Sequence, residues 1–398
     1  MKPALLDLIV CPMDRSNLEL IEWESESVQL SDEHLQIANK MGIDPNKLNR
    51  EILNGVLVNR GKRVFYPIYN GVPRLLVFKT ELAEHFERQY KTELNRDCPD
   101  CAMADEPSAS GEADVLRSFS AEWTDYGWDG ETYWNLSPED MFKSMHFMLD
   151  LDNRPVKHKK VLELGIGIGG IADYVSRSQE CELVGVDLGY SVDAAYAHFG
   201  TNPFFHVVQA SAFALPFKDE SFDFVYSQGV IHHTFSTKTA FDGLSRLPKR
   251  MGRLYIWVYS QYDESRNFKR RLLMALENVL RPMIWPLPNW LQNICLVPLI
   301  PLYIVHQRVA AHYDKNVGVI NYGIRQAIHA ARDRFTPRYI HRHANEEVQE
   351  WFEDAGYTDL QYSSKRDAPA YIPQSFTACT GVDGFRSSLA GESERRAD

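Results

Sequence analysis

Hydrophobic positions fall into short runs along the chain, and the most regular runs flank a cluster of glycines. An apolar run at residues 161–164 leads into a glycine-rich turn, a helical stretch follows, and a second apolar run ends at Asp187. This order is typical of a nucleotide-binding βαβ unit. Glycine lacks a Cβ atom, so a ligand can approach the turn, and the N–H groups that start the helix point toward it. Because Asp187 can accept both hydrogen bonds of a ribose diol, the pattern predicts a site for an adenosine.

The pattern of alternating strands and helices continues toward the C-terminus. Apolar runs at residues 222–227 and 253–259 predict two further strands. Apolar residues at helical spacing predict amphipathic helices at 137–151 and 345–355, and a strand is expected near 359–363. Strands that alternate with helices in this way favour an α/β sheet with helices on both faces.

Four motifs follow one another in order between about residues 155 and 260. Glu163 precedes the glycines in ELGIGIG, an acid ends the second strand, residues 215–227 read LPFKDESFDFVYS, and residues 229–234 read GVIHHT. The glycines alone also satisfy the GxGxxG spacing of dinucleotide dehydrogenases, but those folds usually open with the motif, and here it begins past residue 150. Together the four motifs resemble the class I S-adenosylmethionine-dependent methyltransferases, with a core similar to that of ubiquinone and other small-molecule methyltransferases.

This resemblance implies a Rossmann-like seven-stranded sheet with helices on both faces, and a bound S-adenosylmethionine. Glu163 and the glycines would line the methionine and ribose part of the cofactor, and Asp187 would take the ribose hydroxyls. Ser211 stands where the family often has an acid that contacts the adenine amino group. The residues expected to bind the cofactor are Glu163, Gly165, Gly167, Gly169, Asp187, Ser211, Ala212, Ser227 and Gln228.

Two pairs of histidines are candidates for handling the acceptor. Methyl transfer from a sulfonium needs alignment above all, and it needs a general base only if the acceptor starts protonated. Imidazole titrates near neutrality, so His232 and His233 are the candidate bases. A positioning role for this pair remains the alternative. His341 and His343, with Arg342 between them, form a second polar cluster that could hold an anionic acceptor, and a surface role is the alternative. Trp128, from an aromatic-rich lid before the first core strand, is expected to contact the acceptor.

The first eighty residues predict a separate small α+β domain. Apolar runs at 5–12, 55–59 and 66–76 resemble the zinc-ribbon-like activator subunit of tRNA and release-factor methyltransferases. That family commonly carries two pairs of cysteines, the set that a tetrahedral zinc site requires. Here only Cys11 survives, Asp14 stands at its partner position, and the second pair is absent. We therefore expect no bound metal at this place.

A lone CxxC pair, Cys98 and Cys101, lies in the next segment, and whether it binds metal or only marks an exposed linker is left open. Residues 282–307 contain no Asp, Glu, Lys or Arg, yet five prolines and several polar residues argue against one straight helix that crosses lipid. This run is expected to cap the substrate pocket, so that the acceptor would be partly apolar. A homodimer interface and contact with a membrane surface are the alternatives.

Composition and charge fit a cytoplasmic enzyme. The net charge of −11 disfavours nucleic acid as a partner, and six irregularly spaced cysteines without a secretory leader indicate reduced thiols. We expect a small-molecule methyltransferase. The alternatives are methylation of a lipid-linked or membrane-bound acceptor, and a scaffold that only senses the cofactor. The predicted organisation is an activator-type domain at 1–80, a linker at 81–115, a methyltransferase core with its lid at 116–260, a helical cap at 261–335, the rest of the core at 336–383, and a disordered tail at 384–398.

Overall fold

The computed structural model describes residues 1–124, 137–261, 268–302, 304–305, 308, 323–369, 372, 376 and 379–388. The chain divides into two compact units. The first unit consists of Met1–Ala109, Val156–Tyr226 and Thr239–Leu254. The second consists of Ser110–Pro155, Ser227–Lys238 and Tyr255–Asp398.

The N-terminal part of the first unit is built on an antiparallel sheet. Strand β2 pairs with β1 on one side and with β3 on the other, and a tight turn joins β3 to β4. Ser31 and Gly42 cap the helix between β1 and β2, because the Ser31 hydroxyl accepts the His34 N–H and Gly42 takes a left-handed φ of 68°. The elements are η1 (Pro3–Asp7), β1 (Glu19–Ser27), α1 (Asp32–Met41), η2 (Pro45–Lys47), β2 (Arg50–Asn59), β3 (Val64–Tyr69) and β4 (Val72–Leu75).

The segment expected to be a linker at residues 81–115 is folded over most of its length. It forms α2 (Glu81–Gln89), α3 (Lys91–Asp97) and β5 (Ala102–Met103), and β5 pairs with β3. A third helix, α4 (Glu112–Thr124), starts in this interval. The many charged residues suggested a solvated chain, but Phe86, Leu94 and Cys98 are buried in one apolar cluster with the β2–β3 hairpin. One apolar anchor per helix is enough to dock these short helices on the sheet.

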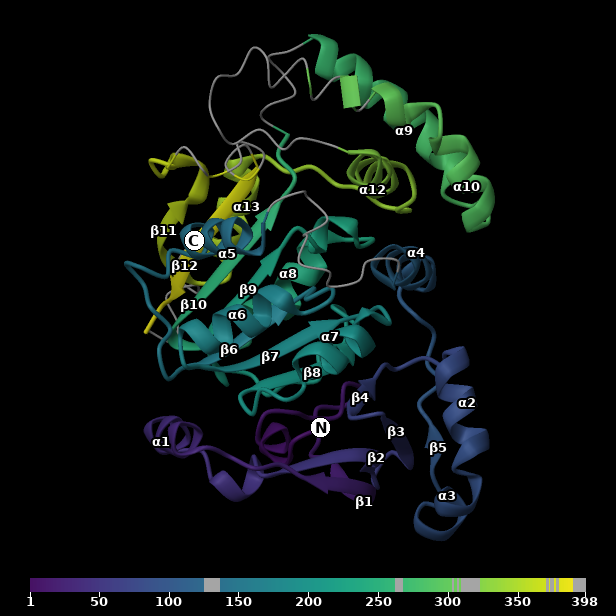
Figure 1. The fold of residues 1–398 in the computed structure, drawn as a ribbon, viewed down its shortest axis with the longest axis vertical. Coiled ribbons are helices and arrows are strands. Elements are labelled where there is room, and N and C mark those ends of the chain that lie inside the picture. The colour runs from purple at the N-terminus through teal and green to yellow at the C-terminus, as the bar shows by residue number, and fades with distance from the viewer. Residues whose placement is uncertain are drawn as a thin grey trace, which may run out of the picture. The chain divides into compact units, whose positions relative to one another are not determined.

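The rest of the first unit is the front half of the core sheet. Parallel pairing joins β6 to β7 and β7 to β8, as the predicted βαβ unit requires. In this unit the strands follow the order β1-β2-β3-β4-β8-β7-β6-β9-β10 (Figure 1). The elements are β6 (Lys160–Leu164), α6 (Gly170–Ser178), β7 (Glu182–Asp187), α7 (Ser191–Phe199), β8 (Phe205–Ala210), β9 (Phe222–Gln228), α8 (Thr237–Ser245) and β10 (Pro248–Val258).

The N-terminal sheet and the core sheet are joined edge to edge within this unit. Strand β4 pairs in parallel with β8, with Arg74 opposite Gln209 and Leu75 opposite Ala210. Strand β8 would otherwise be an open edge of the core sheet, and open edges expose unpaired backbone groups. The small domain therefore completes the sheet at this edge.

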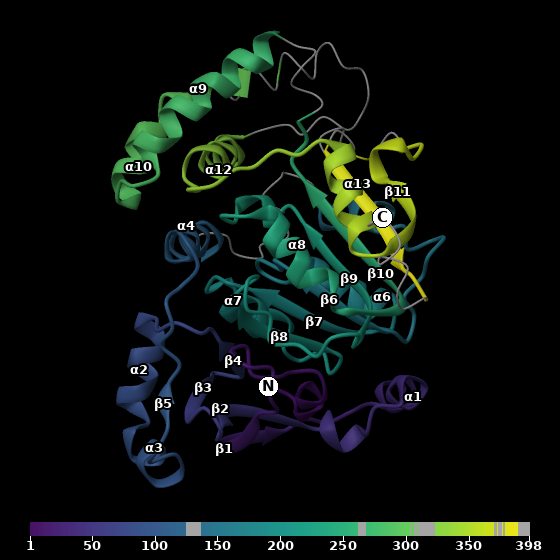
Figure 2. The ribbon, with the colours of Figure 1, turned by 180° about the vertical axis from the view of Figure 1, so that it is seen from behind.

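The second unit contains the end of the core sheet and a helical insertion. From β10 the order continues to β12 and then β11, which are antiparallel to each other, and α13 packs on both strands (Figure 2). The expected helices at 137–151 and 345–355 and the strand near 359–363 are confirmed. The elements are α5 (Pro138–Met148), η3 (Ile231–His233), α9 (Phe268–Ile284), α10 (Asn289–Leu296), α12 (Ile324–Phe335), α13 (Asn345–Asp354), β11 (Tyr357–Tyr362), η5 (Ser363–Lys365) and β12 (Thr380–Arg386).

Along the described residues, the core strands read β8-β7-β6-β9-β10-β12-β11, which is the predicted seven-stranded α/β sheet. Residues 384–386, which were expected in the disordered tail, belong to β12, and Phe385 and Arg386 pair with β11, whereas residues 389–398 lie outside the described residues. The expected cap at 261–335 contains α9, α10 and α12. Among the described helices, none is both long and apolar enough to cross a membrane.

Candidate functional site

The glycine-rich turn after β6 adopts the conformation that its sequence predicts. Gly165, Gly167 and Gly169 have φ values of 88°, 52° and 83°, in the left-handed region where side chains are strained. A Cβ atom at Gly169 would also lie 2.8 Å from the Cβ of Ala195. No side chain caps the start of α6, so the N–H groups of its first turn stay available to a ligand.

Asp187 ties this turn to the loop that follows β7. One carboxylate oxygen accepts the Gly167 N–H at 2.9 Å, and the other accepts the Gly189 N–H at 2.9 Å. Burial raises the pKa of Asp187 to about 6, although these backbone hydrogen bonds oppose the rise. Each carboxylate oxygen has a second lone pair, so the group can hold the loops and still accept from a diol.

Glu163 lies on β6 with only 4% of its surface exposed. Its Oε2 accepts a hydrogen bond of 2.7 Å from the hydroxyl of Tyr226 on β9. Burial raises the pKa of Glu163 to about 8; the Tyr226 hydrogen bond opposes this rise and the charge of Asp187 adds to it. Glu163 is therefore mostly a neutral acid at pH 7, and a nearby cation would favour its ionised form. Sequence reasoning missed Tyr226, whose only signal was its place near the end of a predicted strand.

Ser211 and Ala212 follow the carboxyl end of β8. The buried Ser211 hydroxyl accepts the Phe213 N–H at 3.0 Å, which leaves it a proton to donate and one lone pair. Gln209, which sequence reasoning also missed, pairs with Asp187 across the strands and donates to the Leu188 carbonyl at 2.9 Å. Ala212 follows Ser211 in the same loop. The first unit thus gathers seven of the nine predicted cofactor residues around the ends of β6, β7 and β8.

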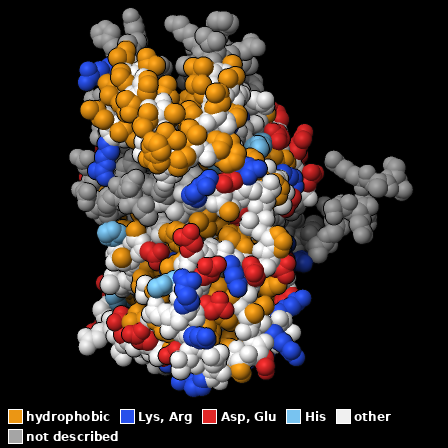
Figure 3. Space-filling view, turned by 90° about the vertical axis from the view of Figure 1, so that its right-hand side faces the viewer, with side chains coloured by type: hydrophobic (Ala, Val, Ile, Leu, Met, Phe, Trp, Pro, Cys, Tyr) orange, Lys and Arg blue, Asp and Glu red, His pale blue; other side chains and the backbone are white. Residues whose placement is uncertain are grey.

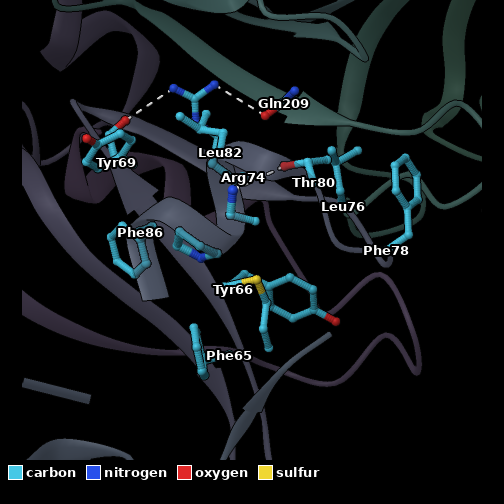
Figure 4. Close-up of a pocket in the computed structure, with 13 residues that line it drawn as sticks. Phe65, Tyr66, Tyr69, Arg74, Leu76, Phe78, Thr80, Leu82, Phe86 and Gln209 are labelled. Carbon is cyan, nitrogen blue, oxygen red and sulfur yellow. Dashed lines mark hydrogen bonds between the residues drawn. The ribbon is translucent and has the colours of Figure 1, made fainter. Parts of the chain in front are cut away.

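Arg74 of β4 connects the N-terminal sheet to Gln209 of β8. It is 5% exposed and donates to the Gln209 side chain at 3.2 Å, to the Tyr69 carbonyl at 3.3 Å and to Asp193 (Figure 4). The small pocket beside it is lined by aromatic rings, and its cavity volume is about 10 Å³. That is space for one water at most, so this pocket does not hold a substrate.

The place around Cys11 and Asp14, where no metal was expected, holds a hydrogen-bonded cluster. The Asn59 amide donates to both Asp14 oxygens at 3.0 and 3.1 Å and to the Ser16 hydroxyl at 2.9 Å. The Cys11 Sγ lies 3.4 Å from the Tyr66 hydroxyl. An amide that donates toward the would-be ligands does not fit a cation. In the described parts of the chain, no group of three or more His, Cys, Asp or Glu residues could hold a metal ion.

Cys98 and Cys101 differ from the exposed linker pair that was one of the two expectations. Cys98 is buried, and burial raises its pKa to about 11. Cys101 is half-buried and packs against the same apolar cluster. A thiol with so high a pKa carries little thiolate at neutral pH, so Cys98 is a packing residue rather than a reactive one.

The histidine pair after β9 lies in the second unit and is fully enclosed. The His232 ring has no exposed surface and lies between the His233 ring at 4.2 Å and the Tyr259 ring at 4.0 Å, measured between centroids. Neither ring nitrogen of His232 has a hydrogen-bond partner among the described residues. Burial holds its pKa well below the usual 6.5, and the neighbouring histidines and Arg342 lower it further. His232 is thus a neutral imidazole with two unused nitrogens.

His233 is held by partners, unlike its neighbour. Its Nδ1 lies 3.2 Å from the Tyr339 carbonyl, and its Nε2 lies 3.6 Å from Asp333 on α12. Asp333 in turn accepts the Tyr259 hydroxyl at 2.6 Å. Burial lowers the pKa of His233, and Asp333 opposes that effect. Phe119 of α4 packs on the ring with centroids 5.2 Å apart. The orientation of His233 is therefore fixed by the protein.

The structure brings the second histidine pair to the first, about a hundred residues away in sequence. The His341 N–H donates to the His232 carbonyl at 2.9 Å, and the His341 ring reaches the Thr234 carbonyl at 2.9 Å. Both His343 nitrogens have partners at 2.9 Å, namely Thr237 and Glu347. His343 thus holds the segment in place and has no ring nitrogen left for an acceptor. Trp128 lies outside the described residues.

Ser227 and Gln228 end β9 in the second unit. Ser227 is fully buried, and the Oε1 of Gln228 is buried without a hydrogen-bond partner in the described part of the chain. A buried amide oxygen without a partner is costly, and a ligand N–H or O–H is one way to satisfy it.

Two family models match separate parts of the chain. Residues 162–256 match the methyltransferase domain, and residues 2–71 match the Trm112p-like protein family. The sterol 24-C-methyltransferase of Candida albicans is 27% identical over 131 residues, which are 30% of this chain and 34% of that enzyme. The chain thus spans about a third of the length of this relative.

Solved structures with similar folds are more distant in sequence. A complex that contains the Haloferax volcanii Trm112 methyltransferase activator matches 68% of this chain and 97% of that chain, with 16% identity and a TM-score of 0.38. Magnesium protoporphyrin IX methyltransferase of Synechocystis PCC 6803, with bound SAH, matches 69% of this chain and 100% of that chain, with 12% identity and a TM-score of 0.41. Residues 162–256, which carry the motifs, therefore form a methyltransferase domain, and residues 2–71 form a Trm112p-like domain at its N-terminal side in the sequence.

Proposed function

We propose that this protein transfers the methyl group of S-adenosylmethionine to a small, partly apolar acceptor. Glu163, the glycine turn and Asp187 would hold the cofactor. The histidine cluster around His232 would handle the acceptor.

Two buried carboxyl groups with raised pKa values carry the cofactor assignment. Burial raises the pKa values of both Glu163 and Asp187. The α-ammonium of an amino acid is the partner that would ionise Glu163, and a ribose diol would donate to Asp187. S-adenosylmethionine presents both groups in one molecule. When bound, it supplies a methyl on a positively charged sulfur, whose departure leaves a neutral thioether.

His232 is our candidate to receive a proton from the acceptor. A base must be neutral beforehand and within hydrogen-bond reach of the proton, and burial keeps this imidazole neutral at pH 7. Its two nitrogens without partners are the observation that favours it over His233. His233, held between the Tyr339 carbonyl and Asp333, would act as a positioning residue whose ring packs on the His232 ring.

An apolar acceptor fits the surroundings of His232. Trp257, Tyr259 and Phe119 pack around the two histidines, and the Trp257 N–H is taken up by the Phe376 carbonyl at 2.8 Å. These aromatic side chains present ring faces rather than hydrogen-bonding groups, and ring faces also attract a sulfonium. The name of the sterol methyltransferase relative, an enzyme for an apolar acceptor, agrees with this choice.

A labelled-methyl screen tests the proposal. Wild-type protein, radiolabelled S-adenosylmethionine and fractionated small-molecule extracts should yield a labelled product that partitions into organic solvent. The Glu163→Gln variant should yield much less of it, because it lacks the charge that holds the ammonium. Tighter binding of a nicotinamide dinucleotide than of S-adenosylmethionine would contradict the cofactor assignment. Cofactor binding without transfer to any fraction would favour the alternative of a cofactor-sensing scaffold.

A further inference from the structure

Helices α9 and α10 present their apolar residues outward. Along α9, Leu276, Val279 and Met283 are 48%, 63% and 66% exposed, at the three- and four-residue spacing of one helix face. Along α10 the same spacing places Trp290, Ile294 and Val297 outward, each more than half exposed. The apolar side chains over these helices form one continuous area in the upper part of Figure 3. A monomeric protein rarely leaves so large an apolar area in water.

Charged and polar residues occupy the inward face of the same helices. Glu277 is 2% exposed and pairs with Arg281 at 2.9 Å and with Arg342 at 3.1 Å. On α10, Gln292 is 4% exposed and donates to the Trp285 carbonyl at 2.9 Å. Apolar Ile284 and Leu296 are buried on the inward side as well, so that side is mixed, whereas the outward residues named above are apolar. Glu277, Arg281 and Gln292 each have at least one partner there.

The sequence places basic residues before and after the charge-free residues 282–307. Helix α9 begins with Lys269, Arg270 and Arg271, and an exposed Arg308 follows the charge-free residues 282–307. No acidic residue lies between residues 278 and 307. The chain as a whole has a net charge of −11, so this concentration of positive charge is a local exception.

We propose that the outward face of α9 and α10 docks on the surface of a lipid bilayer that contains anionic lipids. Amphipathic helices that lie in the interface place Trp, Leu and other apolar residues among the acyl chains and Lys or Arg near the headgroups. A second copy of this chain would bring the same basic residues to the interface, and Glu277 of α9 is buried and already paired with Arg281 and Arg342. Anionic headgroups neutralise these residues, so charge complementarity selects the bilayer. This proposal concerns binding alone and stands apart from the identity of the acceptor.

Vesicle flotation with the full chain tests the proposal. We expect the protein to float with vesicles of phosphatidylcholine and phosphatidylglycerol, and to float less with phosphatidylcholine alone or at high salt. The double variant Met283→Gln, Trp290→Gln should bind the anionic vesicles at least about tenfold more weakly, because two apolar side chains no longer leave water. Met251→Gln is the matched control, since Met251 is 63% exposed on β10, outside this face. Melting temperature and circular dichroism should show that both variants fold.

Three outcomes would overturn the proposal. The first is wild-type protein that does not bind anionic vesicles, or that binds neutral ones equally well. The second is a double variant that binds as the wild type does. The third is sedimentation equilibrium that finds a wild-type dimer which the double variant dissociates, because the face would then be covered by a second copy.

Discussion

The Tyr226 hydroxyl donates a 2.7 Å hydrogen bond to the buried carboxyl group of Glu163. A phenol stabilises a carboxylate less than an ammonium does, so the pKa of Glu163 stays at about 8. The acid is therefore set to lose its proton when a cationic ligand arrives.

Cofactor binding should release a proton at neutral pH. Glu163 is mostly protonated at pH 7, and the ligand ammonium would convert it to the carboxylate. Calorimetry in buffers of different ionisation enthalpy should find that wild type releases roughly one more proton than Glu163→Gln at pH 7, and that the difference vanishes well above pH 8. Equal proton counts in the two proteins would place the ammonium elsewhere.

Glu163 should also make stability depend on pH. Its pKa is 4.5 as a free side chain and about 8 in the folded protein, so the folded state binds the proton more tightly. The free energy of unfolding therefore falls as pH rises from 4.5 to 8, by about 1.4 kcal/mol for each pH unit at most. Without cofactor, Glu163→Gln should melt close to wild type at pH 5 and above it at pH 8. A melting-temperature difference that does not change with pH would contradict this.

Asp187→Ala should weaken binding of S-adenosylmethionine by roughly 2–4 kcal/mol, the value of one or two charge-assisted hydrogen bonds. The substitution also frees the Gly167 and Gly189 N–H groups that now hold the two loops. Because the pKa of Asp187 is about 6, wild-type affinity should fall as pH drops through 6. Calorimetry measures both effects. Asp152→Ala is the control. The Asp152 side chain is 85% exposed, so the variant should bind S-adenosylmethionine with the wild-type affinity.

Local patterns predicted the βαβ unit because each of its parts is encoded in consecutive residues. The glycines need positive φ, and Asp187 must end a strand, so both appear as motifs. The Tyr226 contact was not predictable in this way, because it joins residues 63 positions apart through the pairing of strands. The same holds for His341, whose closeness to His232 depends on the path of the chain after the helical insertion. Helices α2 and α3 were missed because single apolar residues such as Phe86 and Leu94 anchor them among many charges.

The Trm112p-like domain should carry no stoichiometric zinc. Asn59 donates its amide hydrogens to Asp14 and Ser16, where a metal would need electron pairs. Metal analysis of the purified full chain should therefore find far less than one zinc per molecule, before and after dialysis against zinc. One zinc per chain that disappears in Cys11→Ala would refute this prediction. Asp14→Ala should lower the melting temperature, because the Asn59 amide would lose its main partner.

His232→Ala should slow methyl transfer and leave S-adenosylmethionine affinity within about 1 kcal/mol of wild type, which is the pattern of an interaction made in the transition state. The acceptor found by the labelled-methyl screen would serve for the assay. Because the pKa of His232 lies well below 6.5, the wild-type rate at saturating S-adenosylmethionine and acceptor should stay flat from neutral pH down through 6.5 and fall only in more acidic solution. His232→Ala should lose that acidic limb.

The neighbouring residue supplies the matched comparison for this prediction. His233 is fixed by Asp333 and the Tyr339 carbonyl, so His233→Asn should reduce kcat less than His232→Ala and should keep the acidic limb of the pH profile. Asp333→Asn should resemble His233→Asn, because both loosen the packing of the residue-233 side chain on His232. If His233→Asn instead removes the acidic limb while His232→Ala keeps it, the base is His233.

If both variants lose cofactor affinity equally, the two histidines are part of the scaffold. Unchanged turnover in both would remove the two histidines from the chemistry, and the acceptor would then be one that reacts without a base.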